Sequence, residues 1–367
     1  MLGLLLVVIS GCKTTPRAPT PLGTVFLTNN FEVAPPAPLT TTPTEHMEPT
    51  ITTVPPPAPT SVATSSSWPT NWINVWVPLE AWGKYNGLEK FTVLKSNPHP
   101  IYQFSTSRGA VALKIGTRIA SCFGFEFWLG YAPQLVKGIP YVHWLDARKV
   151  LQPLLHSRRL GYHTNRVIVL DPGHGGLDSG TRSIFNSKYE KEYTLDWALR
   201  LSQILEARGW KVVLTRTNDR DIALSERVAI ADRANADFFL SLHFNSAFPN
   251  RDLIGIETYC LTPTGMPSSL LRSQDDDLQQ NFPNNAFDEQ NLQIAIQLHG
   301  ALMQVAESSD RGVKHARFMG VLRGQNRPAV LIEGGYLSNP REARKIETAE
   351  YRQKLAEGVA DGLKTLE

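Results

Sequence analysis

The stretch Val-Ile-Val-Leu-Asp-Pro-Gly-His-Gly-Gly (167–176) decides the fold of this chain. Its β-branched run, 167–170, predicts a buried strand, and Asp171-Pro172 ends that strand abruptly. The glycines around His174 permit a tight turn and leave the imidazole unobstructed at the carboxyl end of the strand. Ligands and catalytic groups gather at this edge of open α/β sheets, so His174 is a candidate metal ligand.

Two later segments repeat this arrangement. Residues 236–242 read as a buried strand followed by His243, and residues 328–332 read as another strand ended by Glu333. Helical patterns lie between the strands, which is the order of βαβ units. We therefore predict an α/β fold with a mixed, mostly parallel sheet of about six strands flanked by helices. The carboxyl ends of parallel strands share one edge, so His174, His243 and Glu333 should converge.

A fourth candidate is Glu190, which lies just ahead of a predicted helix whose apolar positions begin at Leu195. An acidic residue there also suits the positive end of a helix without any metal. Glu192 competes for the same role, and the pattern alone leaves the two nearly even. Two histidines and one carboxylate are the ligand set of an open catalytic zinc site, with water in the fourth position.

Residues from about 166 to 366 resemble the zinc-dependent N-acetylmuramoyl-L-alanine amidases of the amidase family 3 type. The matching stretches include Asp-Pro-Gly-His-Gly-Gly, Glu-Lys-Glu-Tyr-Thr-Leu and Ser-Leu-His-Phe-Asn-Ser-Ala, and their ranges are 171–176, 190–195, 212–216, 224–231, 241–247, 255–259, 311–314, 321–323 and 329–340. The resemblance implies that His174, Glu190 and His243 bind one Zn²⁺ ion. It also implies that Glu333 is the catalytic carboxylate, and it favours Glu190 over Glu192.

The same resemblance implies the reaction and its substrate. The bond would be the amide between N-acetylmuramic acid and L-alanine in peptidoglycan, cleaved during cell-wall turnover and daughter-cell separation. Glu333 would take a proton from the attacking water and deliver it to the leaving amine. The family usually has Ala where this chain has Phe244, and we expect that change to alter the shape of the substrate groove.

Two other functions compete with this interpretation. A zinc peptidase acting within the stem peptide would use the same constellation on another amide, and its products would be cut peptides. A non-catalytic wall-binding protein would ignore chelators, but the intact quartet argues against it. Weaker candidates are Asp171, as a partner of a ligand or a turn residue, and Arg227 and Asn245, as substrate contacts or as a buried salt bridge and a turn cap.

Composition excludes some classes of protein. The 367 residues carry a formal net charge of only +3, which gives no case for nucleic-acid binding. Three cysteines fit neither a disulfide framework nor a thiolate zinc site. We expect Cys122 and Cys260 to be buried free thiols.

The N-terminal sequence resembles that of an exported lipoprotein. Residues 1–12 end in Ile-Ser-Gly-Cys, which is similar to a lipobox and implies a lipid on Cys12. The resemblance implies an exported protein of the bacterial cell envelope, anchored to a membrane and facing the periplasm, and by analogy with sorting rules of envelope lipoproteins Lys13 favours the outer membrane. Residues 13–67 are rich in Pro and Thr and predict a disordered linker.

Residues 68–160 predict a small α+β domain ahead of a catalytic domain over 161–367. Strand-like runs at 91–94, 101–104, 111–115, 125–129 and 140–142 alternate with glycines. The stretches 113–117, 131–133 and 138–142 resemble the copper amine oxidase N-terminal-like domain, although nothing argues for copper. The openings 75–79 and 140–145 look alike, which hints at an internal duplication. We expect a wall-binding or spacer role for this domain.

The segment 262–290 is long and polar. Loops of this length are usually functional or disordered. One interpretation is a lid over the zinc groove on which an activator protein acts, and the other is a solvated surface excursion.

Overall fold

The computed structural model describes residues 68–88, 90–95, 99–155, 166–270 and 276–364. The expectations for the signal peptide, Cys12 and the linker lie outside these residues, as does the connection 156–165. The described residues all fall within one compact unit, Ser65–Glu367. Among the helices they form, none is both long and apolar enough to cross a membrane.

The C-terminal part of the chain, from residue 166 onward, is built on six strands of one sheet. Their order is β10 (Lys211–Leu214), β9 (Val167–Pro172), β11 (Phe238–Asn245), β14 (Ala329–Tyr336), β12 (Ile256–Cys260) and β13 (Asp310–His315). All neighbours pair in parallel except β12 with β14. The predicted mixed, mostly parallel sheet is therefore confirmed.

The three central strands β9, β11 and β14 are buried along nearly their whole length, as their apolar sequences predict. Strands β11 and β14 extend further than the sequence suggested. His243 and Glu333 consequently lie within strands and pair with each other in register, rather than following the strand ends.

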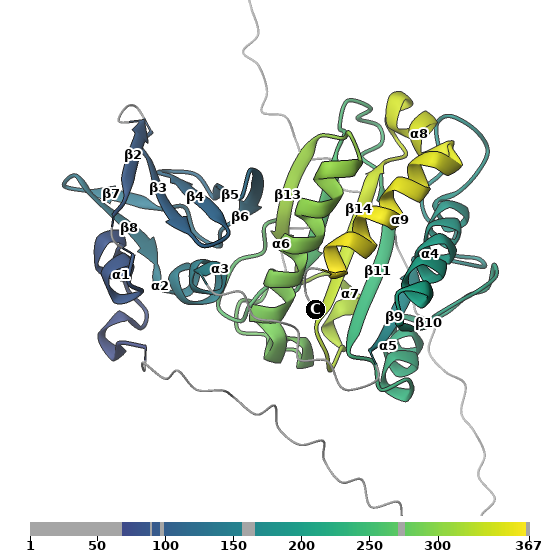
Figure 1. Cartoon of the computed structure of the whole chain (residues 1–367), viewed down its shortest axis with the longest axis horizontal. Helices are drawn as coiled ribbons and strands as arrows, with labels where there is room; N and C mark the ends of the chain where they lie inside the picture. The colour runs from purple at the N-terminus through teal and green to yellow at the C-terminus, as the bar shows by residue number, and fades with distance from the viewer. Residues whose placement is uncertain (1–67, 89, 96–98, 156–165, 271–275, 365–367) are drawn as a thin grey trace, which may run out of the picture. The chain divides into compact units, whose positions relative to one another are not determined.

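Helices cover both faces of this sheet. One face carries α4 (Glu190–Ala207), α6 (Asp288–Val305) and α9 (Ala349–Lys364), which cross in front of the strands in Figure 1. The other face carries the shorter α5 (Leu224–Arg233) and α7 (Gly320–Arg323), whose Ala231 and Leu322 share a core cluster with Phe239 and Leu331. Helix α8 (Pro340–Glu347) follows β14 and packs against it.

Phe244 identifies the face on which the functional side chains lie. Its ring packs against Trp197 of α4 at a centroid distance of 5.4 Å and is buried on the α4/α9 side. Successive side chains of a strand alternate between faces, so His243 points to the α5/α7 side. The expectation that Phe244 reshapes the substrate groove is therefore wrong, because its side chain belongs to the core behind the sheet.

The N-terminal part, residues 68–155, continues the same sheet. Its antiparallel strands β2 (Thr92–Lys95), β3 (Ile101–Thr106), β4 (Gly109–Lys114), β5 (Ile119–Cys122) and β6 (Phe125–Trp128) follow one another in order. Strand β6 pairs in parallel with β13 at Phe127 and Val313. Among the described residues this makes one sheet of eleven strands.

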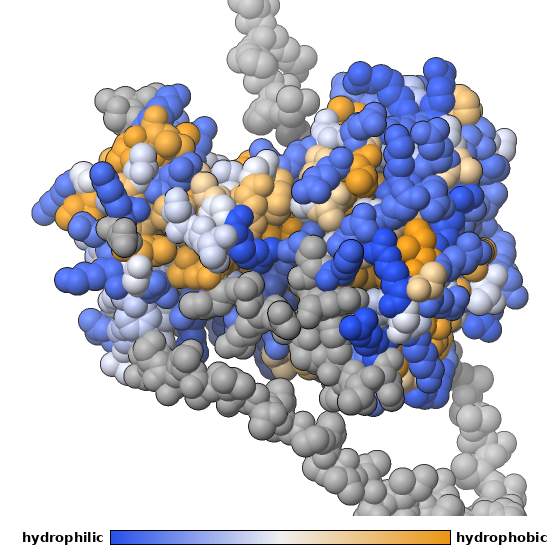
Figure 2. All heavy atoms as spheres, in the orientation of Figure 1, coloured by the Kyte–Doolittle hydropathy of each residue, from blue (hydrophilic) through white to orange (hydrophobic). Residues whose placement is uncertain are grey.

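A second, smaller sheet completes the N-terminal part. It contains β1 (Trp76–Pro78), β8 (Ile139–His143) and β7 (Gln134–Val136), and the helices α1 (Leu79–Tyr85), α2 (Trp144–Asp146) and α3 (Gln152–Leu155) pack nearby. The two similar openings seen in the sequence both run from strand to helix, and their strands pair antiparallel with each other. Hydrophobic residues gather on the surface near β2 in Figure 2, where Val93 and Leu94 are exposed.

Polar contacts and a shared core join the two parts. The backbone N–H of Glu126 in β6 donates to Asp310 of β13, and His299 of α6 lies 2.9 Å from the same carboxylate. One hydrophobic cluster includes residues of both parts. Cys122 and Cys260 are buried free thiols, as expected.

We predict that Phe244→Ala lowers the free energy of unfolding by about 3–5 kcal/mol, because it opens a cavity against Trp197. Denaturant unfolding measures this loss. The steady-state kinetics of the folded variant should stay close to wild type, since Phe244 lies behind the sheet. A selective loss of turnover without loss of stability would contradict this placement.

Candidate metal centre

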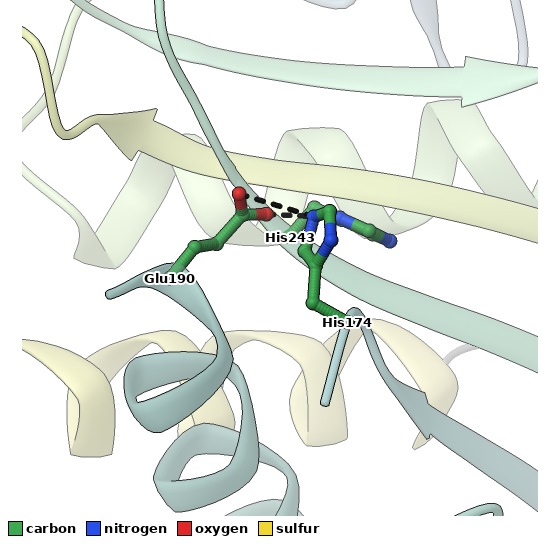
Figure 3. A group of neighbouring side chains, drawn as sticks. All are labelled: His174, Glu190 and His243. Atoms are coloured by element: carbon green, nitrogen blue, oxygen red, sulfur yellow. Dashed lines mark hydrogen bonds and ion pairs between the residues drawn. The ribbon is translucent and has the colours of Figure 1, made fainter. Parts of the chain in front are cut away.

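Three side chains from distant parts of the chain meet at one edge of the sheet. His174 follows β9, Glu190 is the first residue of α4, and His243 lies near the end of β11 (Figure 3). The Nε2 atom of His174 is 3.1 Å from Oε2 of Glu190, and Nδ1 of His243 is 2.9 Å from its Oε1. One nitrogen or oxygen from each residue lies within 4.8 Å of the others, a spacing that could hold a metal ion.

Glycines create the space for these side chains. A Cβ atom at Gly173 would collide with the ring of His243, and one at Gly180 would lie 2.7 Å from both Glu190 and the ring of His174. His174 itself has a φ of 63°, in the left-handed region that ordinary residues rarely adopt. The run around His174 is thus needed both for the turn and for the close approach of the ligands.

The carboxylate of Glu190 is buried and fully engaged. Besides the two imidazoles, it accepts hydrogen bonds from the backbone N–H groups of Thr181 and Phe244, each at 3.1 Å. Burial by itself would raise the pKa of Glu190, but His174 and His243 hold it well below the usual range. The glutamate is therefore anionic at neutral pH, ready to bind a cation.

His174 responds to the same charges. Burial lowers its pKa, but Glu190 and Asp178 outweigh burial and raise the pKa of His174 to about 10. Without a metal, a proton on this imidazole balances the buried carboxylate. A divalent cation would take the place of that proton, because metal ligands must be deprotonated.

Asp178 is a residue that sequence reasoning missed. Its Oδ1 lies 2.8 Å from Nδ1 of His174, on the side of the ring away from Glu190. A carboxylate in this position fixes the orientation of a ligating histidine. The sequence did indicate this contact, because Asp178 stands four residues after His174, on the other side of the Gly-Gly turn. The loop is held in place because Asp219 and Asp221 accept hydrogen bonds from the backbone N–H groups of Gly176 and Leu177.

Glu333 lies beside this cluster. It pairs in register with His243 on the neighbouring strand, so the two backbones are about 4.8 Å apart and their side chains share a face. On its other side Glu333 pairs with Glu257 of β12. Glu333 is buried and comes from a third strand of the same edge.

The weaker candidates do not join the cluster. Asp171 is buried and forms an ion pair with Arg227 at 2.5 Å, as one of the two interpretations of Arg227 predicted. Asn245 donates to Glu257 at 2.9 Å. Glu192 accepts a hydrogen bond from the backbone N–H of Tyr189, so it caps the helix and does not contact the histidines.

The described part of the segment 262–290 begins at the opposite end of the strands from this edge, so the expectation of a lid is wrong for these residues. Strand β12 runs antiparallel to β14 and ends near the start of β14, opposite the edge where His243 and Glu333 lie. There the segment contacts the N-terminal part, where the guanidinium of Arg118 donates to the carbonyls of Pro267 and Ser268. Of residues 271–275 nothing is described.

The C-terminal part of the chain matches a known protein family. A family model described as N-acetylmuramoyl-L-alanine amidase matches residues 168–365, which is more than half of the chain. The chain belongs to the N-acetylmuramoyl-L-alanine amidase family. The matched region of this amidase-family chain contains His174, Glu190, His243 and Glu333.

This amidase-family chain is similar in sequence to several named amidases. It is 35% identical over 198 residues to the sporulation-specific N-acetylmuramoyl-L-alanine amidase of Bacillus subtilis, covering 53% of this chain and 66% of that protein. It is 31% identical over 219 residues to AmiA of Escherichia coli, covering 54% and 75% respectively. The chain thus spans just under two thirds of the B. subtilis relative.

The chain is also similar to two solved structures of N-acetylmuramoyl-L-alanine amidases. The catalytic domain of CwlV, an amidase from Bacillus (Paenibacillus) polymyxa, is 31% identical, with 55% of this chain and 97% of that chain covered and a TM-score of 0.45. An N-acetylmuramoyl-L-alanine amidase from Clostridium difficile 630 is 30% identical, with 55% and 97% covered and a TM-score of 0.46.

We predict that Asp178→Ala weakens the affinity for Zn²⁺ by about 10–100-fold, because His174 loses the partner that orients its ring. Isothermal titration of metal-free protein with Zn²⁺ measures the change. Asp219→Ala is the matched control, since it removes a carboxylate that holds the same loop through Gly176 but does not contact a histidine. Equal losses in both variants would mean that Asp178 acts only through loop order.

Proposed function

We propose that this chain is a zinc-dependent N-acetylmuramoyl-L-alanine amidase, which hydrolyses the amide between N-acetylmuramic acid and L-alanine in peptidoglycan. The observation that carries the proposal is the cluster of His174, Glu190 and His243, with Glu333 in register beside it. The family membership of residues 168–365 supplies the reaction class.

The donor set fits a catalytic zinc ion. Two imidazole nitrogens and one carboxylate are the ligands of open zinc sites, which leave a position for water or substrate. In the proposed centre His174 contributes Nε2, because its Nδ1 faces Asp178. His243 contributes Nδ1, which faces Glu190. When bound, zinc supplies Lewis acidity and lowers the pKa of a water molecule.

Glu333 would carry out the proton transfers of the reaction. Its place one strand away from His243 puts a carboxylate on the same face as the proposed ligand. Glu333 would accept a proton from the attacking water and return it to the amine of L-alanine as the carbon–nitrogen bond breaks. The carboxyl product stays on the lactyl group of the sugar, and the amine product is the stem peptide.

The rest of the chain supports a place in the cell envelope. We propose that the protein is exported, anchored through a lipid on Cys12 and faces the periplasm, with residues 13–67 acting as a linker to the wall. Residues 68–155 would serve as a wall-binding or spacer element. An activator that acts on 262–290 stays a proposal, and it would bind the edge opposite the catalytic cluster.

Digestion of purified sacculi by the full chain tests the proposed function. Mass spectrometry should find free lactyl carboxylates on the glycan and intact stem peptides that begin with L-alanine. A chelator should abolish release, and added Zn²⁺ should restore it. Cut peptides would indicate a zinc peptidase instead, and activity that ignores the chelator would exclude a metal-dependent reaction.

We predict that Glu333→Gln retains Zn²⁺ at wild-type stoichiometry but lowers turnover by about 10²–10⁴-fold, because the amide cannot accept a proton. Metal analysis and kcat measured on the same preparation test this. Glu192→Gln is the control, since that exposed carboxylate caps α4 and does not contact the cluster. Near-full activity of Glu333→Gln would remove Glu333 from the mechanism.

A further inference from the structure

A second charged cluster lies next to Glu333, and we propose that its Arg311 binds a carboxylate of the stem peptide. The inference rests on the proposed function and deepens it, because it assigns a subsite for the part of the substrate beyond the first alanine. It is carried by the position of Arg311, by the way in which Glu257 holds it, and by the partial exposure of its side chain.

Glu257 is the centre of this cluster. Its side chain is 1% exposed and accepts five hydrogen bonds from the residues around it. The donors are Nε of Arg311 and Nζ of Lys314, both at 2.6 Å, the hydroxyls of Tyr259 at 2.7 Å and Tyr336 at 2.9 Å, and the amide of Asn245 at 2.9 Å. Burial would raise the pKa of Glu257, but the two cations lower it to about 2. The carboxylate is therefore a fixed anion.

The two cations of the cluster have different surroundings. The side chain of Lys314 is only 2% exposed, so it neutralises Glu257 inside the protein. The side chain of Arg311 is 29% exposed and uses only Nε to hold Glu257. Among the described residues its two Nη atoms make no further hydrogen bond. Arg311 is thus the cation that remains available to a ligand.

Arg311 is held in a fixed orientation. Its aliphatic carbons pack closely against Gly255, where a Cβ atom would lie 2.6 Å from Cγ of Arg311. Its guanidinium lies 5.4 Å from the centre of the Tyr336 ring. An oriented guanidinium fork matches the geometry of a carboxylate, which it binds with two parallel hydrogen bonds.

The sheet places Arg311 at a useful distance from the reacting bond. His243, Glu333 and Glu257 form one row across β11, β14 and β12, and Arg311 follows on β13. Two strand spacings of about 4.8 Å separate Arg311 from Glu333, which gives about 10 Å. An extended peptide advances about 3.3 Å per residue. A carboxylate two or three residues beyond the scissile amide would therefore reach the guanidinium, and the peptidoglycan stem carries free carboxylates there.

Other charges near Arg311 leave this assignment intact. Asp310 accepts hydrogen bonds from the backbone N–H groups of Glu126 and Gly312, and it contacts His299. Glu126 of β6 lies near both cations of the cluster, and no ion pair joins it to Arg311 among the described residues. The carboxylate of Glu126 lies on the side of Arg311 that faces the N-terminal part, where it would repel a substrate carboxylate. The peptide would therefore approach Arg311 from the side of Glu333.

The test compares two substrates with the full-length enzyme loaded with zinc. One is a muramoyl tripeptide with free carboxylates, and the other is the same compound with those groups converted to carboxamides. Arg311→Gln should raise KM for the free carboxylate by roughly tenfold, the lower end of what a charge-assisted hydrogen bond contributes. It should leave kcat, and both constants for the amidated substrate, nearly unchanged.

Two further variants serve as controls. Arg311→Lys keeps the charge without the fork and should recover part of the affinity for the free carboxylate. Arg251→Gln removes another arginine from the loop that precedes β12, where it lies over the Phe248 ring, and should not distinguish the substrates. Thermal unfolding of each variant establishes that the compared proteins are folded.

The outcomes separate this inference from the proposed function. Equal effects of Arg311→Gln on both substrates, or no effect on either, would overturn the carboxylate subsite. Muramoyl-L-alanine methylamide, which lacks a carboxylate beyond the alanine, reports the reaction itself. Failure of the wild type to cleave any of the three compounds would overturn the proposed function. Cleavage of all three without discrimination by Arg311 would overturn only the subsite.

Discussion

One buried carboxylate between two imidazoles is the constraint on which this structure depends. Glu190 begins α4, while His174 and His243 come from the ends of β9 and β11, so their contact fixes a helix against two strands. Such a charge is costly to bury unless it is paired and hydrogen-bonded. Here the two imidazoles pair with the carboxylate, and two backbone N–H groups donate hydrogen bonds to it. Gly173 and Gly180 are required at this point because any larger residue would displace a ligand.

The sheet converts this local contact into an extended surface. Register pairing places His243, Glu333 and Glu257 side by side on one face, and Phe244 behind them packs into the opposite layer of helices. Arg311 and Lys314 of β13 both form ion pairs with the Glu257 anion of this row. Because β6 pairs with β13, the same sheet continues into residues 68–155.

Several expectations failed for physical reasons that a linear pattern does not contain. Phe244 was placed near the substrate because it follows His243, but alternation along β11 sends it to the other face. The segment 262–290 was expected above the metal, but the reversed direction of β12 delivers its described residues to the opposite edge. Asp178 went unnoticed because its role depends on the positive φ of His174.

The sequence alone determined the class of fold, the buried strands and three of the candidate residues, His174, His243 and Glu333, because β-branched runs ended by Gly, Pro and polar groups reflect burial and chain reversal, which are local properties. It left Glu190 and Glu192 nearly even until the family resemblance favoured one. Only the tertiary structure decided which carboxylate meets the histidines, where the long segment goes, and that Glu257 joins Arg311 to the catalytic row. Those outcomes depend on strand direction and register, which bring together residues far apart in the chain.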